Sequence, residues 1–266
     1  MKGQDMTYVK GGFRQRFLHE TNLTGSFLKI AHTMPAEILG VAGYDFVVVD
    51  EEHAPISREA TDRIVLACKA ADIGCLVRVK SAEPADILSA LDCGADGILV
   101  PHVDTAQKAR AIVSAARYRG GSRGYSPTTR AGRFGEVTLA EHVEKEDNRG
   151  LVIAMIEDPL AVEQIDAIVT TDGLDGVFIG RGDLTVAYGE TKPGSEPVLR
   201  ATKTICATAR AHGVAICAMA GSAKDAGWLC ELGVTAFVLA SDQTFIRDAA
   251  RARLAELRNA LSAVQE

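Results

Sequence analysis

Charged side chains follow directly after several short apolar runs of this sequence. Glu157 comes after one such run, and Asp183 lies shortly after the next. Two carboxylates that face each other repel, so one has a raised pKa unless a cation lies between them. Oxygen-only ligands suit Mg²⁺ or Mn²⁺ better than zinc. The alternative is that each acid caps the helix after it, as Asp183 before Leu184 could.

A second group of charged residues follows earlier runs. His53 lies three residues after Asp50, whose carboxylate could hold the imidazole in one tautomer and raise its basicity. Arg78 lies inside the next run, where burial without an anion is costly. It predicts a site for an oxyanion or carboxylate, or else an ion pair with Asp50 or Glu52. Alternation places Lys80 on the same side of that run as Arg78.

Eight apolar runs must position these residues. Most are continuous rather than alternating, which is typical of strands in a parallel sheet covered on both faces. The runs are 25–30, 46–50, 75–80, 97–100, 151–157, 176–180, 214–219 and 236–240. The charged residues fall near the carboxyl ends of these runs, where barrels of alternating strands and helices carry their working residues.

Helical segments alternate with the runs, at 58–71, 82–91, 105–116, 197–212 and 222–232. Several end at a glycine that suits a left-handed helix cap, namely Gly74, Gly94, Gly213 and Gly233. The repeat averages about 33 residues, so we expect one (β/α)8 TIM barrel domain over residues 1–266. A doubly wound open sheet is the alternative, although no G-x-G-x-x-G follows the first run.

Three segments fall outside the repeat. Residues 1–12 are polar and predict a loose tail without a signal peptide. The interval 117–149 is long and rich in arginine, which predicts a lid or a contact region. The last helix, at about 247–264, carries Leu254, Leu257 and Leu261 on one stripe. We expect it either to close the barrel or to pack on a partner subunit.

The composition excludes several classes of function. A net charge of −6 with no basic run, together with 5% aromatic residues, argues against nucleic-acid binding. No apolar stretch approaches the roughly 18 residues that a membrane helix needs. The six cysteines are scattered, which indicates reduced thiols in a cytoplasmic protein rather than disulfides or a zinc site. The expected partners are therefore small molecules.

The chain resembles the HpcH/HpaI aldolases, the metal-dependent class II pyruvate aldolases, over almost its whole length. The matching segments lie in the family's order at 44–55 (YDFVVVDEEHAP), 76–79 (LVRV), 91–101 (LDCGADGILVP), 156–157 (IE), 176–184 (GVFIGRGDL) and 232–242. The resemblance implies a (β/α)8 barrel of the phosphoenolpyruvate/pyruvate-domain type. It also implies a homohexamer of paired barrels that exchange the last helix.

The resemblance assigns roles to the charged residues. It implies that Glu157 and Asp183 bind Mg²⁺ or Mn²⁺, with Co²⁺ as a further candidate. The backbone amides of Gly182 and Asp183 would hold the pyruvate carboxylate. His53 and Asp50 would form the catalytic base. The remaining role, that of binding the enolate, falls to Arg78.

The chain departs from the family pattern in three segments near these residues. Glu51 replaces a glycine, Lys80 stands where a proline usually follows the LVRV segment, and Arg181 replaces the proline of Gly-Pro-Ala-Asp-Leu. The last two changes add positive charge. We expect Lys80 and Arg181 to recognise a carboxylate or hydroxyls on the aldehyde part of the substrate.

The implied reaction is reversible aldol cleavage of a 4-hydroxy-2-oxo acid. Its products are an aldehyde and pyruvate, or a related 2-oxo acid such as hydroxypyruvate. Three alternatives stay open: a Schiff-base aldolase that uses Lys80, an acyl-CoA lyase of the citrate-lyase β-like branch, and a non-catalytic barrel that binds a keto acid.

Overall fold

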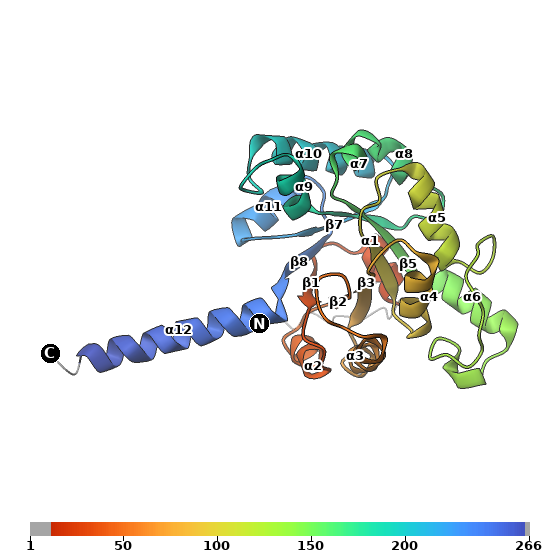
Figure 1. The fold of residues 1–266 in the computed structure, drawn as a ribbon, viewed down its shortest axis with the longest axis horizontal. Coiled ribbons are helices and arrows are strands. Elements are labelled where there is room, and N and C mark those ends of the chain that lie inside the picture. The colour runs from red at the N-terminus through yellow and green to blue at the C-terminus, as the bar shows by residue number, and fades with distance from the viewer. Residues whose placement is uncertain (1–11, 264–266) are drawn as a thin grey trace, which may run out of the picture.

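Eight parallel strands pair in sequence order, and the last pairs with the first, so the sheet closes into a barrel. The computed structural model describes residues 12–263, which leaves most of the expected tail outside the described part (Figure 1). The closed barrel rules out the open doubly wound sheet. The strands are β1 (Leu23–Leu28), β2 (Phe46–Asp50), β3 (Gly74–Arg78), β4 (Gly97–Val100), β5 (Leu151–Ile156), β6 (Gly176–Ile179), β7 (Ala215–Met219) and β8 (Ala236–Ser241).

Helices surround this barrel (Figure 1). Those expected from the sequence are α3 (Arg58–Ala70), α4 (Pro84–Asp92), α5 (Ala106–Ala116), α10 (Glu196–Ala211), α11 (Ala223–Glu231) and α12 (Asp242–Ala263). The structure adds α1 (Phe13–His19), α2 (Met34–Val41), α6 (Leu139–Arg149), α7 (Pro159–Glu163), α8 (Ile165–Val169) and α9 (Arg181–Ala187). Most of these additional helices are only one or two turns long, which is too short for a helical period to show in a sequence.

Helix α1 closes the amino-terminal end of the barrel. Phe17 is fully buried among the side chains that fill the barrel interior. Arg14 pairs with Asp175, and Arg16 pairs with Asp45, both of which directly precede strands. The carboxyl end of the barrel, where the strands finish, is therefore the end at which a site can form.

Strand alternation decides which residues reach the interior. Phe46 and Val48 of β2 belong to the inner cluster, whereas Val47 and Val49 pack outward against the helices. Asp50 continues the inward series at the last position of β2. Arg78 does the same in β3, after Leu76. The inward register therefore ends in charged residues at the carboxyl end of the barrel.

Two strands end two residues earlier than the sequence indicates. The first run ends at Leu28 rather than residue 30, and the third ends at Arg78 rather than residue 80. The inward register therefore does not carry on to Lys80, which is exposed. The prediction that Lys80 shares a face of the strand with Arg78 is wrong, because the chain leaves the sheet between them.

The glycine caps are confirmed at three of four positions. Gly94, Gly213 and Gly233 have φ angles of 82°, 68° and 97°. The prediction for Gly74 is wrong, since Asp72 takes the left-handed conformation there, with a φ angle of 55°. Gly74 instead opens β3, where a Cβ atom would lie 2.4 Å from the ring of Phe13.

The arginine-rich interval 117–149 folds against the outside of the barrel and contains α6 (Figure 1). Several of its arginines are bound within the chain instead of being displayed to a partner. The ion pairs join Arg117 to Asp175, Arg123 to Asp92, and Arg130 to Asp62.

Helix α12 extends away from the barrel as a single long helix (Figure 1). Leu254, Leu257 and Leu261 are 48%, 57% and 58% exposed. The helix therefore does not close the barrel of its own chain. Of the helices described between residues 12 and 263, none is both long and apolar enough to cross a bilayer. All six cysteines are free thiols, and five of them are buried.

Candidate active site

A cavity of about 710 Å³ opens at the carboxyl end of the barrel. Its walls come from strand ends on several sides of the barrel and from the loops that follow them. Side chains that line it include Phe27, Lys29, Arg78, Arg181, Asp183, Asp225, Ser241 and Thr244. Such a volume holds a small organic molecule larger than pyruvate.

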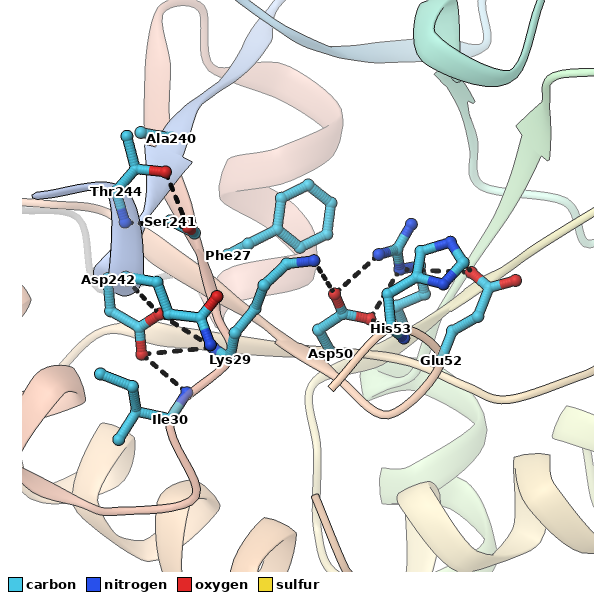
Figure 2. A network of polar contacts seen from close by, with 12 residues as sticks. Phe27, Lys29, Ile30, Asp50, Glu52, His53, Ala240, Ser241, Asp242 and Thr244 are labelled. Carbon is cyan, nitrogen blue, oxygen red and sulfur yellow. Dashed lines mark hydrogen bonds and ion pairs between the residues drawn. The ribbon is translucent and has the colours of Figure 1, made fainter. Parts of the chain in front are cut away.

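Asp50 binds three neighbouring residues at this end of the barrel. It is fully buried, and its two oxygens accept hydrogen bonds from Arg78 at 3.0 and 2.7 Å. The ammonium of Lys29 lies 2.9 Å from Oδ2 (Figure 2). Burial alone would raise the pKa of Asp50, but Arg78 and Lys29 outweigh it and lower the pKa to about 2.

Arg78 makes the ion pair that the sequence left open. It binds Asp50, and its Nε also lies 3.4 Å from Glu52. Its guanidinium lies 4.8 Å from the ring centroid of Phe27. The side chain lines the cavity although the residue is only 6% exposed. Arg78 is thus held in one orientation by three neighbours.

His53 contacts Asp50 differently from the expected arrangement. Its backbone N–H, not its ring, donates to Asp50 Oδ1 at 3.1 Å. The ring Nε2 lies 3.8 Å from Glu52 Oε2, and the side chain is 56% exposed. The oxygens of Asp50 already serve Arg78 and Lys29, so the carboxylate does not fix the tautomer of the imidazole.

Glu157 follows β5, three strands around the barrel from Asp50, and is 2% exposed. Its Oε1 accepts the backbone N–H of His102 at 2.8 Å. Burial raises its pKa to about 7, and the charges of Asp183 and Glu52 act in the same direction. Gly180 gives it room, because a Cβ there would lie 2.5 Å from the Glu157 side chain. A nearby cation would relieve this unfavourable charge.

Neither acid caps a helix. The residue at the N-cap of α7 is Asp158, and that of α9 is Gly180, so Asp183 lies inside the first turn of α9. Asp183 is exposed and lines the cavity. Within residues 12–263, no group of three or more acidic, histidine or cysteine side chains is arranged as a metal site. A cation held by these two carboxylates would take its other ligands from water and substrate, as Mg²⁺ commonly does.

The three departures from the family pattern lie in different surroundings. Arg181 lines the cavity, but Asp225 binds its guanidinium at 2.9 and 2.5 Å. Lys80 is exposed and does not belong to the cavity wall. Glu51 is buried on the outer side of β2, where it accepts a hydrogen bond from Thr61 of α3.

Two residues that sequence reasoning did not assign lie at the site. Lys29 lies two positions after Phe27, so the alternation of β1 could have predicted that it points inward. His102 follows β4, has a φ angle of 53°, and places Nδ1 3.0 Å from Asp158 and 3.6 Å from Glu157. Burial lowers the pKa of His102, but these carboxylates outweigh it and raise the pKa. Its position at a strand end was the available signal.

A closed parallel barrel with charged residues gathered at its carboxyl end defines an enzyme of the (β/α)8 class. The family described as "HpcH/HpaI aldolase/citrate lyase" matches residues 23–249 of this sequence, and the chain belongs to this family. It is a carbon–carbon lyase that carries out aldol cleavage of small molecules. The family resemblance and the barrel expected from the sequence are both confirmed.

This chain is similar in sequence and in fold to several known proteins. A 5-keto-4-deoxy-D-glucarate aldolase of Klebsiella pneumoniae is 35% identical over 227 residues, which cover 85% of this chain and 88% of the relative. The structure of a family protein from Burkholderia cenocepacia has a TM-score of 0.87 and 28% identity, and the match covers 92% of this chain and 98% of that one. The citrate synthase SbnG has a TM-score of 0.85 and 32% identity, with coverages of 93% and 98%.

Proposed function

We propose that this chain catalyses the reversible, divalent-metal-dependent cleavage of a 4-hydroxy-2-oxo acid to an aldehyde and pyruvate, or a related 2-oxo acid. The observation that carries this proposal is the Glu157 carboxylate, which is 2% exposed beside His102 and whose pKa burial raises to about 7, with the charges of Asp183 and Glu52 acting in the same direction. An enzyme gains nothing from such a charge unless a cation or a proton uses it.

Glu157 and Asp183 would hold the metal, for which Mg²⁺ and Mn²⁺ are the first candidates and Co²⁺ the next. Their all-oxygen donor set and the unfavourable charge on Glu157 fit a divalent cation. When bound, the cation supplies Lewis-acid chemistry that lowers the energy of the enolate. The opening amides of α9, at Gly182 and Asp183, line the cavity and would bind the substrate carboxylate.

Arg78 would stabilise the oxygen on which negative charge develops. Asp50 occupies its Nε and one terminal nitrogen, which leaves the other terminal nitrogen to donate into the cavity. Because Asp50 fixes the guanidinium beforehand, little reorganisation is needed as the charge forms.

His53 would move the proton of the reaction. In cleavage, the C3–C4 bond of the substrate breaks, the C4 hydroxyl gives up its proton to form the aldehyde, and C3 gains a proton to complete pyruvate. The exposed imidazole would accept the hydroxyl proton. Asp50 would contribute by anchoring the His53 backbone and the Arg78 side chain.

The most direct test uses the substrate named by the relatives, 5-keto-4-deoxy-D-glucarate. The protein is stripped with a chelator, Mg²⁺ or Mn²⁺ is added back, and pyruvate release is followed with lactate dehydrogenase. We expect release only with metal and almost none in Glu157→Gln. Release that is insensitive to the chelator would contradict metal dependence.

The citrate synthase relative favours one second candidate, the formation of a citrate-type product. Incubation with oxaloacetate and acetyl-CoA, followed by detection of free CoA thiol, separates this candidate from pyruvate aldol cleavage. We expect no thiol release above the rate without enzyme.

We also propose that the chain forms a homo-oligomer, a hexamer of paired barrels that exchange α12. The exposed leucines of α12 have no cover within residues 12–263, and α2 presents Met34, Ile38 and Val41 at 56%, 58% and 93% exposure. Large apolar side chains exposed together along a helix are typical of an interface. Sedimentation of a chain with glutamine at the three α12 leucines should show smaller particles than the parent chain.

A further inference from the structure

We propose that Lys29 is the residue that recognises the aldehyde half of the substrate, by binding a carboxylate on it. This inference rests on the proposed aldol chemistry and adds a specificity-determining residue to it. It replaces the expectation that Lys80 reads the acceptor, since Lys80 is outside the cavity.

The backbone around Lys29 is held rigidly. Asp242, which is 5% exposed at the start of α12, accepts the N–H groups of Lys29 and Ile30, each at 3.0 Å. Figure 2 shows this carboxylate beside the backbone of Lys29 and Ile30, with the Lys29 side chain reaching toward Asp50. A fixed backbone restricts where the ammonium can go, as a binding residue requires.

The charge balance singles out Lys29 among the cations of the cavity wall. In the described part of the chain these are Lys29, Arg78 and Arg181. Arg181 is bound by both oxygens of Asp225 and by the carbonyl of Met219 at 2.8 Å.

Arg78 is bound by both oxygens of Asp50 and approached by Glu52. Lys29 shares a single Asp50 oxygen with Arg78, and its side chain is 23% exposed. An ammonium has three donors, so within residues 12–263 two remain for a ligand. Lys29 is the least neutralised cation of the wall.

The barrel order places Lys29 where the acceptor half should lie. β1 lies across the barrel from β5, after which Glu157 follows. If the 2-oxo acid binds near Glu157 and Asp183, the rest of the substrate extends toward β1 and β8. There the cavity is lined by the hydroxyls of Ser241 and Thr244, which lie 3.1 Å apart, beside Lys29. Hydroxyls and an ammonium together suit a hydroxylated acid.

The geometry favours charge recognition over covalent chemistry. Lys29, and not Lys80, is the amine that faces the cavity, so it is the structural candidate for a Schiff base. An ammonium held in an ion pair has no free lone pair for attack on a carbonyl, and Lys29 pairs with the permanently ionised Asp50.

The test compares two acceptors of equal length, 4-oxobutanoate and pentanal, in aldol addition to pyruvate. In Lys29→Met, we expect the ratio of kcat/KM for 4-oxobutanoate to that for pentanal to fall about 10- to 100-fold, the worth of a hydrogen bond between charged groups. Lys29→Arg keeps a cation and should recover much of the ratio. Lys203→Met, the same change at an exposed position of α10, is the matched control and should leave the ratio as it is.

Two results would overturn the inference. An equal loss on both aldehydes would mean that Lys29 acts only through Asp50. Trapping of pyruvate on Lys29 by borohydride would make the residue a Schiff-base amine. Exchange of the pyruvate methyl protons, measured without aldehyde, separates this failure from that of the proposed function. If the parent chain exchanges these protons but Lys29→Met keeps the same ratio between the two aldehydes, only the role of Lys29 is refuted. If the parent chain shows no exchange, the proposed function is refuted as well.

Discussion

Asp50 and Glu157 are two buried carboxylates at the same end of one barrel, and their pKa values are shifted in opposite directions. They are 0% and 2% exposed, yet the pKa of Asp50 is lowered to about 2 and that of Glu157 is raised to about 7. Depth of burial therefore does not explain the difference. Burial raises both pKa values, but Arg78 and Lys29 outweigh it at Asp50. At Glu157 it is only partly offset by His102, and the charges of Asp183 and Glu52 add to it.

This contrast separates an anchor from a binding site. The oxygens of Asp50 bind Arg78, Lys29 and the His53 backbone. Because these contacts lower its pKa to about 2, Asp50 is ionised near neutral pH. Glu157 has a charge that the surrounding residues do not fully neutralise, so it is suited to bind a cation from solution.

The largest effect is expected from Glu157→Gln. Loss of one of two metal ligands should reduce kcat/KM for aldol cleavage by about 1,000-fold or more, since Lewis-acid stabilisation contributes several kcal/mol. The amide oxygen can still accept the His102 N–H, so urea unfolding of the metal-free protein should show no loss of stability. A large fall in stability would mean that Glu157 is chiefly structural.

Asp50→Asn, unlike Glu157→Gln, should lower the stability of the protein strongly. Removal of its charge leaves Arg78 and Lys29 without their shared partner, so we expect a loss of about 3–5 kcal/mol in the free energy of unfolding. Activity should also fall, because Arg78 loses its fixed orientation. Urea unfolding beside Glu157→Gln provides the comparison, and equal stabilities for the two variants would refute the distinction between anchor and binding site.

The two groups should give opposite pH dependences of stability. The raised pKa of Glu157 contributes stability that is fully present below its usual pKa of 4.5 and is lost as the pH rises through about 7. The lowered pKa of Asp50 contributes about 2 kcal/mol that is present above 3.8 and lost as the pH falls through about 2. Unfolding of metal-free protein across pH 4–8 should show the first slope, and saturating Mn²⁺ or Glu157→Gln should remove it.

The smallest effect is expected at Lys80. Because its side chain is exposed outside the cavity, Lys80→Met should change kcat/KM for charged and neutral aldehydes by less than about twofold. Steady-state kinetics with 4-oxobutanoate and pentanal measure this directly. A selective loss on 4-oxobutanoate would restore the role that the sequence indicated.

Much of this architecture could be predicted from the sequence. Continuous apolar runs with acids at their ends indicated a parallel barrel, and the ordered segments around Asp50, Arg78 and Gly180 indicated the family. These features lie in short stretches of the sequence, so they can be recognised without the tertiary structure.

The partners of each charge could not be predicted in the same way. Asp50 has donors from Arg78 of β3, from Lys29 directly after β1 and from the His53 backbone; the sequence offered Arg78 as one partner but the His53 ring as the other. Lys80 was misplaced because β3 ends two residues before it, whereas Lys29, one residue past the end of β1, still follows the inward series and was missed. Strand ends are set by tertiary contacts, so the sequence alone does not show how far a register continues.

We propose that this barrel end forms the enolate of pyruvate with the help of a divalent ion and Arg78. Exchange of the pyruvate methyl protons in D₂O, followed by NMR, tests this without any assumption about the aldehyde. We expect exchange that stops in chelator, returns with Mg²⁺ or Mn²⁺, and fails in Arg78→Ala. No exchange with any divalent ion in the folded protein, or exchange that persists in Arg78→Ala, would contradict it.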